Sequence, residues 1–158
     1  MQFMFVGEHN GKLDNKGRII FPGQLKRQIP EEEQSLALVL KKDIYEKCLI
    51  LYTVSEWEYQ TNIIKNKLNP FNKRHSDFLR EYYRGTAELY LDSSNRLLIP
   101  KKLLDYIGAD KELVFAGQKG KIEIWANENY NSKQITEEDF ADLANDILGG
   151  SFGFYNED

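Results

Sequence analysis

Two short stretches of this sequence place an arginine four residues after an aspartate. The first is residues Asp14–Arg18 and the second is residues Asp92–Arg96. Gly17 and Asn95 precede the two arginines, and glycine and asparagine are the residue types that best tolerate the positive φ of a tight turn. An arginine fixed at a turn presents a planar fork that can hold a phosphate, or the edge of a guanine, at two points. The pattern therefore predicts two anion-binding turns.

Lysines lie close in sequence to both turns and add positive charge beside them. If the turns bind DNA, the expected contacts come from Arg18, Arg96, Lys16, Lys12, Lys101 and Lys102. The shape of the turns is then expected to depend on Asp14, Gly17, Asp92 and Asn95. The alternative is that each aspartate only closes its own turn and pairs with its own arginine. Because both charges occur in both copies, we favour the functional interpretation.

Catalysis and metal binding fit these residues less well than anion binding does. Asp14 and Asp92 could act as paired carboxylates, but a nearby arginine keeps a carboxyl ionised, whereas a general acid must hold a proton. His9 and His75 are far apart in sequence and offer no metal-ligand spacing. The segment that follows Asp92 lacks the later ligands of a calcium loop. We therefore expect no enzyme activity, no metal, no cofactor and no small-molecule substrate.

The two turns belong to a longer repeat. The segment LDNKGRIIFPGQL, which begins at Leu13, matches LDSSNRLLIPKKL, which begins at Leu91, at an offset of 78 residues. Gly7 and Gly85 continue the match at the same offset. Two copies of one unit in a single chain predict a pseudo-twofold pair of modules.

Each copy has the same expected order of elements: strand, turn, strand, short helix, strand, strand. Residues 85–92 alternate apolar and polar side chains with the period of a strand. The later elements are strands at 19–21 and 97–99, helices at 24–29 and 101–108, and strands at 36–40, 48–54, 112–116 and 121–125. Asn10-Gly11 is a turn-forming pair inside the first strand, where we expect a β-bulge.

Helices are predicted between the copies and after them. Ser55 to Glu58 has the pattern of a capping box, which should open a helix that ends at Asn69-Pro70. A second linker helix should turn Phe71, Phe78, Leu79, Tyr82 and Tyr83 inward and Lys73, Arg80 and Arg84 outward. Its bases, including Arg74, are expected to pair with Asp77 and Glu81 rather than to bind phosphate. A last helix should run from a Thr136 cap to Gly149, with an apolar stripe of Phe140, Leu143, Ile147 and Leu148, and residues 151–158 should fray.

Composition limits the class of protein. The chain has 158 residues, of which 41% are hydrophobic, enough to bury a core. Its net charge of −4 hides an uneven distribution, because residues 128–158 carry one base and eight acids, leaving +3 on residues 1–127. No apolar run could span a membrane, and the first residues lack a leader pattern, so we expect a cytoplasmic protein without membrane contact. The single cysteine, Cys48, lies in an apolar run and should be a buried, inert thiol.

These motifs resemble those of the MraZ family of bacterial transcriptional regulators, relatives of the AbrB/MazE-type DNA-binding fold. The signature is a repeated D-x-x-x-R motif, usually with glycine before the arginine; DNKGR fits it fully, and DSSNR departs at Asn95. The resemblance extends through Gly7-Glu8, the segment FLREYYRGTAELYLD and the strand IEIW, and covers roughly residues 5–127. It does not account for the acidic C-terminal segment.

The resemblance implies a nucleoid-associated regulator of a cell-division and cell-wall operon. It implies swapped-hairpin, double-split-barrel modules in a ring-shaped homo-oligomer that meets double-stranded DNA at promoter repeats. The expected fold is α+β, with two tandem β-rich modules related by a pseudo-twofold axis. The expected divisions are residues 1–54, a helical linker at 55–84, residues 85–127, and an acidic C-terminal part at 128–158. The alternative function is that of an oligomeric scaffold that does not bind DNA.

Overall fold

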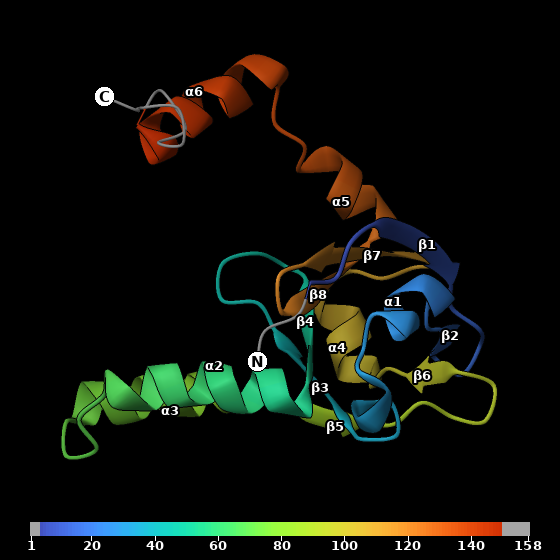
Figure 1. Cartoon of the computed structure of the whole chain (residues 1–158), viewed down its shortest axis with the longest axis horizontal. Coiled ribbons are helices and arrows are strands. Elements are labelled where there is room, and N and C mark those ends of the chain that lie inside the picture. Colours follow the sequence, from blue (N-terminus) through green and yellow to red (C-terminus); the bar gives the residue numbers. More distant parts are fainter. Residues whose placement is uncertain (1–3, 150–158) are drawn as a thin grey trace. The chain divides into compact units, whose positions relative to one another are not determined.

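The computed structural model describes residues 4–149 (Figure 1). The chain forms two compact units, Met1–Asn127 and Glu128–Asp158. The expected fraying of residues 151–158 lies outside the described residues. Residues 1–127, which contain both sequence copies and the linker between them, therefore form one unit.

Among the described residues of the first unit, eight strands form two antiparallel sheets. They are β1 (Glu8–Lys12), β2 (Arg18–Ile20), β3 (Leu38–Lys42), β4 (Leu49–Thr53), β5 (Ala87–Leu89), β6 (Arg96–Leu98), β7 (Glu112–Gln118) and β8 (Lys121–Ala126). Six of them form a sheet in the order β1-β7-β8-β4-β3-β5, and the other two form the β2–β6 ribbon. The α+β class with two tandem β-rich modules is confirmed.

The two copies exchange their first strands. β1 of the first copy pairs with β7 of the second, and β5 of the second copy pairs with β3 of the first. β4 and β8, the last strand of each copy, pair at the centre of the sheet. This symmetric order is the pseudo-twofold relation that the repeat predicts.

The β-bulge expected at Asn10-Gly11 is not present. β1 pairs with β7 without interruption, with Asn10 opposite Val114 and Gly11 opposite Leu113. Glycine serves a different purpose here, because an added Cβ at Gly11 would lie 2.8 Å from Cδ1 of Ile19. The missing side chain makes room for the ribbon beneath the strand.

Helices connect these strands or follow the last of them. They are α1 (Gly23–Arg27), a 3-10 turn η1 (Glu31–Glu33), α2 (Val54–Asn66), α3 (Lys73–Tyr83), α4 (Lys101–Tyr106), α5 (Asn127–Ser132) and α6 (Glu137–Leu148). Pro22 and Pro100 directly precede α1 and α4, as their fixed φ allows at a helix start. The short helix α5 is an element that the sequence analysis does not predict.

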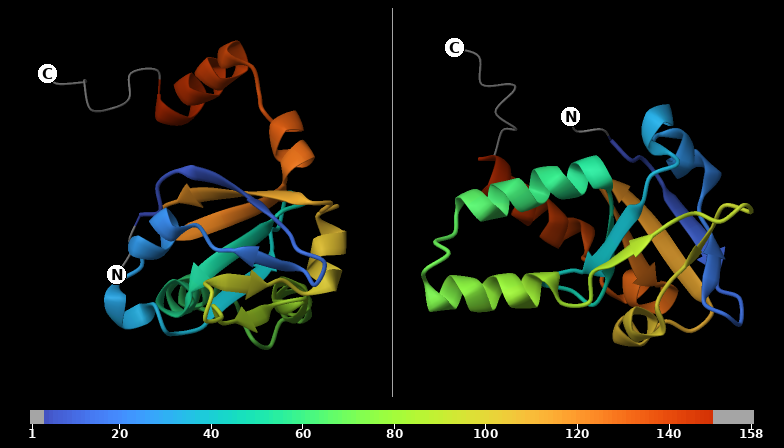
Figure 2. Two further views of the ribbon diagram at one scale, coloured as in Figure 1. Left: turned by 90° about the vertical axis from the view of Figure 1, so that its right-hand side faces the viewer. Right: turned by 90° about the horizontal axis from the view of Figure 1, so that it is seen from below.

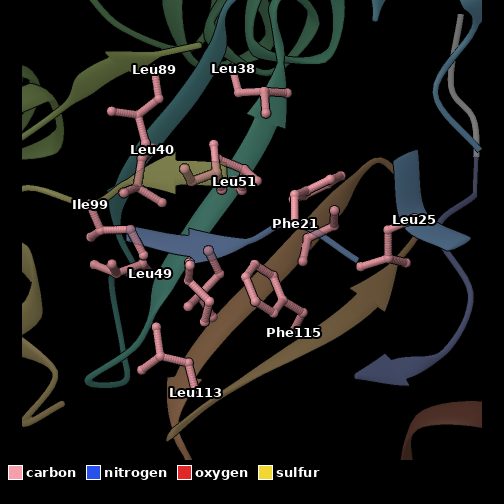
Figure 3. Packing of buried hydrophobic residues seen from close by; sticks show 14 of the residues in the cluster. Phe21, Leu25, Leu38, Leu40, Leu49, Leu51, Leu89, Ile99, Leu113 and Phe115 are labelled. Atoms are coloured by element: carbon pink, nitrogen blue, oxygen red, sulfur yellow. The ribbon is translucent and has the colours of Figure 1, made fainter. Parts of the chain in front are cut away.

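The core lies between the six-stranded sheet and a layer made of the ribbon, α1 and α4 (Figures 2 and 3). Ile19 and Leu97, the central pair of the ribbon, are 1% and 0% exposed. Phe21 meets the ring of Phe115 edge-on at 5.9 Å. Burial of such side chains from both copies stabilises them as one body.

The linker helices α2 and α3 form an antiparallel hairpin (Figures 1 and 2). The cap of α2 is Thr53, whose Oγ1 accepts from the backbone N–H of Glu56, so the expected cap at Ser55 was two residues late. Trp57 of α2 stacks on Tyr82 of α3, with ring centroids 6.1 Å apart.

The inward face expected for the second linker helix is only partly correct. Tyr82 is buried and Leu79 is partly buried, but Phe78 and Tyr83 are exposed. Phe71 is 96% exposed and lies before the helix, because Asn72 caps α3 by accepting from the N–H groups of Arg74 and His75. The sequence analysis placed Phe71 inside the helix, although this residue precedes the cap at Asn72.

The second unit contains α6, with the expected limits. Thr136 Oγ1 accepts from the N–H of Asp139, and Gly149 ends the helix at a φ of 75°. The apolar stripe of Phe140, Leu143, Ile147 and Leu148 is exposed. Within residues 4–149, no helix is long and apolar enough to cross a membrane.

Candidate functional site

The first Asp-x-x-x-Arg motif forms a closed turn in front of β2. Oδ1 of Asp14 accepts from the backbone N–H groups of Lys16 and Arg18, each at 2.9 Å. Oδ2 of Asp14 accepts from Nε of Arg18 at 2.7 Å. The backbone N–H of Asp14 donates to the carbonyl of Arg18 at 2.9 Å. One carboxylate thus fixes both the backbone of the turn and the arginine that follows it.

The second motif repeats this geometry in front of β6. Oδ1 of Asp92 accepts from the N–H groups of Ser94 at 2.8 Å and Arg96 at 2.9 Å. Oδ2 of Asp92 accepts from Nε of Arg96 at 2.9 Å. The own-arginine pairing named in the alternative interpretation is therefore present in both turns. It uses Nε, so the donors of the two terminal guanidinium nitrogens of each arginine are not part of that ion pair.

Both turns need a residue in the left-handed region, and the two copies meet this need differently. Gly17 has a φ of 83° and Asn95 a φ of 59°; among residues 4–149, Asn95 is the only residue other than glycine with a positive φ. The side-chain oxygen of Asn95 accepts a hydrogen bond from Nζ of Lys26, in α1 of the other copy. The repeat equivalent of Lys26 is Leu104, which comes 78 residues later in the chain. Leu104 lies beside Gly17 of the first turn.

Lys26 is a residue that the sequence analysis missed. It could have been found from the repeat, because it is a lysine at a position where the other copy has leucine. Each turn is therefore supported by the short helix of the other copy: α1 reaches the second turn, and Leu104, in α4, reaches the first.

The charges of the turns argue against acid–base catalysis. The backbone N–H of Arg18, together with its side chain and the N–H of Lys16, lowers the pKa of Asp14 to about 2. The backbone N–H of Arg96 is likewise the main cause that lowers the pKa of Asp92. Both carboxyls are ionised at neutral pH, so neither can act as a general acid.

The β2–β6 ribbon joins the two turns and aligns their arginines. In its antiparallel register Arg18 lies opposite Leu98, Ile19 opposite Leu97, and Ile20 opposite Arg96. Since alternate residues of a strand face opposite sides, Arg18, Ile20, Arg96 and Leu98 share the outer face. The arginine side chains are 30% and 32% exposed, so both are partly buried. Each copy contributes one arginine to a single surface, the outer ribbon face.

The predicted lysines are not gathered on that face. Lys16 and Lys101 line a hollow of about 610 Å³ beside the first turn, so Lys101 lies at the turn of the other copy. That hollow also holds three aspartates, and Lys101 lies 3.8 Å from one of them, Asp105. Lys12 lies opposite Glu112 in the sheet, and Lys102 is exposed on α4. Acids therefore balance much of the charge of these lysines.

The linker bases form ion pairs on the surface of α3. Lys73 and Arg80 contact Asp77 at 2.9 and 3.0 Å, and Arg84 contacts Glu81 at 3.0 Å. The pairing expected from the sequence is thus confirmed for these three bases, and none of the ion pairs of the described residues includes Arg74. Such exposed pairs contribute at most about 1 kcal/mol each, so they fix little structure.

The single cysteine has an ordinary structural explanation. Cys48 is fully buried, and burial raises the pKa of its thiol, as expected for an inert core cysteine. Over residues 4–149, no three His, Cys, Asp or Glu side chains are grouped so that they could hold a metal ion. The outer ribbon face is the surface on which both copies place an equivalent arginine.

Comparison with known proteins gives a consistent family. The family model described as "MraZ protein, putative antitoxin-like" matches the chain twice, over residues 4–81 and 82–148, which confirms the tandem repeat. Proteins named Transcriptional regulator MraZ are similar along most of their length. That of Flavobacterium psychrophilum is 38% identical over 146 residues, 91% of each chain. That of Christiangramia forsetii is 35% identical over 145 residues, 91% of this chain and 92% of the relative.

Proposed function

This chain belongs to the MraZ family, and from that premise we propose that it regulates transcription by binding double-stranded DNA through the outer ribbon face. The observation that carries the proposal is the placement of Arg18 and Arg96 on one face of one ribbon, each held by its own aspartate. Two oriented guanidinium groups suit guanine edges or phosphates, which accept paired hydrogen bonds.

The dimensions of the ribbon fit the major groove of DNA. Two strands lie about 4.8 Å apart, and three residues extend roughly 10 Å, about the length of three base pairs. The major groove is about 12 Å wide and admits a two-stranded ribbon. One ribbon can thus reach a short element with an arginine at each end.

Tight binding needs several such ribbons, since one subunit presents only two arginines. We propose a ring-like homo-oligomer in which neighbouring subunits meet successive promoter repeats, so that weak contacts act together. The exposed stripe on α6 and the two edge strands, β1 and β5, are surfaces that self-association could cover. Light scattering should give a multiple of 18.5 kDa; a mass of 18.5 kDa at micromolar concentration would refute the assembly.

The proposed setting is the cytoplasm, on the nucleoid, where the protein controls a cell-division and cell-wall operon. This setting is inferred from the likeness to the family. The two matched turns of the chain, which we propose contact DNA, support it. The partners are promoter DNA and further copies of the chain, without a membrane or a cofactor.

A mobility-shift assay with DNA from upstream of the protein's own gene tests the proposal. Arg18→Ala and Arg96→Ala should each weaken binding, since the loss of one base contact costs about 1–3 kcal/mol, roughly 5- to 150-fold. Lys73→Ala removes a paired cation from α3 and serves as the control that should bind like the parent. Unaltered binding by both arginine variants would show that the DNA contacts lie away from the outer ribbon face. No binding of any DNA would favour the scaffold alternative.

A further inference from the structure

The outer ribbon face carries two aliphatic side chains that the core does not use. Ile20 is 65% exposed and Leu98 is 55% exposed, while their neighbours Ile19 and Leu97 are buried. The strand alternation therefore places two large apolar groups on the solvent side of the ribbon. Leu98 is the repeat equivalent of Ile20, so both copies place an aliphatic side chain at this position.

Each of these side chains stands directly beside an arginine. Leu98 is the cross-strand partner of Arg18, and Ile20 is the partner of Arg96. Directly opposite residues in an antiparallel pair have Cβ atoms about 5 Å apart. Each end of the ribbon thus presents one cationic fork and one aliphatic group, and the two come from different copies.

We propose that Ile20 and Leu98 are specificity-determining residues that contact the C5-methyl groups of thymine in the major groove. The inference rests on the proposed function, because it concerns the same face. A ribbon that places an arginine on a guanine brings its cross-strand neighbour near an adjacent base. Thymine is the base that offers an apolar methyl group there, and aliphatic side chains are suitable partners for it.

The hydrogen-bonding groups on the face favour DNA over an apolar protein partner. An apolar protein surface laid on Ile20 and Leu98 would also cover Arg18 and Arg96. Each of these arginines pairs through Nε with its own aspartate, so the partner would still need acceptors for the terminal guanidinium donors. DNA supplies methyl groups for the aliphatic pair and acceptors for the arginines on the same groove floor. The composition of the face matches a mixed surface of that kind.

The test compares DNA with and without the methyl group. The segment upstream of the protein's own gene is prepared with thymidine or, in a second sample, with deoxyuridine, which pairs identically but lacks the methyl. The parent protein should bind the thymidine duplex more tightly, by roughly fourfold for each methyl buried. The double variant Ile20→Ser with Leu98→Ser should bind both duplexes equally, while Ile20→Val with Leu98→Val should keep the preference.

The outcomes separate this inference from the proposed function. If the parent binds both duplexes with equal affinity, the methyl contact is wrong and DNA binding through the arginines stands. If no DNA is bound, both fail. If the serine variant lowers the oligomer mass in light scattering and leaves the thymidine preference intact, the pair belongs to a protein interface and the inference is overturned. Thermal unfolding of the serine variant should match the parent, since both side chains are exposed.

Discussion

The side-chain oxygen of Asn95 accepts a hydrogen bond from Nζ of Lys26, which belongs to the other sequence copy. The first turn has Gly17 and Leu104 at the equivalent positions. An asparagine in the left-handed region therefore occurs with a donor lysine, and a glycine with a leucine. The two differences between the copies, asparagine for glycine in the turn and lysine for leucine in the supporting helix, thus compensate each other.

A double-mutant cycle should detect this coupling. Lys26→Leu removes the donor and should lower the free energy of unfolding by about 0.5–1.5 kcal/mol. In the Asn95→Gly background the same change should cost less, because glycine needs no side-chain partner, giving a coupling of roughly 0.5–1 kcal/mol. Urea unfolding of the four proteins measures it. Additive effects would show that Lys26 does not support the turn.

Gly11→Ala should destabilise the protein although the residue lies on an edge strand. The added Cβ would meet Cδ1 of Ile19 at 2.8 Å, and forcing an extra carbon into a packed site costs about 1–3 kcal/mol. Ile19→Val removes that Cδ1, so the double variant should recover part of the loss in urea unfolding. A Gly11→Ala protein as stable as the parent would contradict this packing.

Acid should weaken the turns in a defined pH range. The pKa of Asp14 falls from 3.8 to about 2 on folding, and that of Asp92 is also lowered. A depressed pKa stabilises the folded state above the unfolded pKa, and the benefit is lost as pH falls from about 4 toward 2. The free energy of unfolding of Asp14→Asn with Asp92→Asn should therefore fall less steeply over this range. Parallel pH profiles for the parent and variant would contradict the assignment.

Neutralising the acidic surface of α6 should tighten nonspecific DNA binding. The variant replaces four acids and keeps the apolar stripe; the acids are Glu137, Glu138, Asp142 and Asp146. Repulsion from phosphates is then reduced, and affinity for random-sequence DNA should rise at low salt. The gain should shrink near 0.15 M salt, where charges beyond about 8 Å are screened. Equal affinities at low salt would mean that α6 stays away from the DNA.

The sequence predicted features that depend on local pattern and on the repeat. Ile19 and Leu97 are equivalent in the repeat, and both are buried. Asp14 and Asp92 shape the turns as their spacing suggests. Thr136 and Gly149 bound α6 because capping is decided within a few residues.

The starts of α2 and α3 were misplaced locally, at the caps Thr53 and Asn72, but the other missed features depend on contacts between distant parts of the chain. Lys26 and Asn95 meet because the copies interleave, which a pattern within one copy does not reveal. Lys101 follows the second turn in sequence but lies beside the first for the same reason. Gly11 looked like a bulge because its packing partner, Ile19, lies on another strand.

The exchange of strands between the copies also governs when the protein can fold. Glu8 in β1 pairs with Ala116 in β7, so the N-terminal strand finds its place in the sheet only after most of the chain has been synthesised. At about 5–20 residues per second, β1 leaves the ribosome roughly 5 to 20 seconds before its partner. Pairings of such high contact order form late and slow the folding rate. Neither copy completes its sheet alone, and the first half must avoid aggregation during that interval until the second half is made.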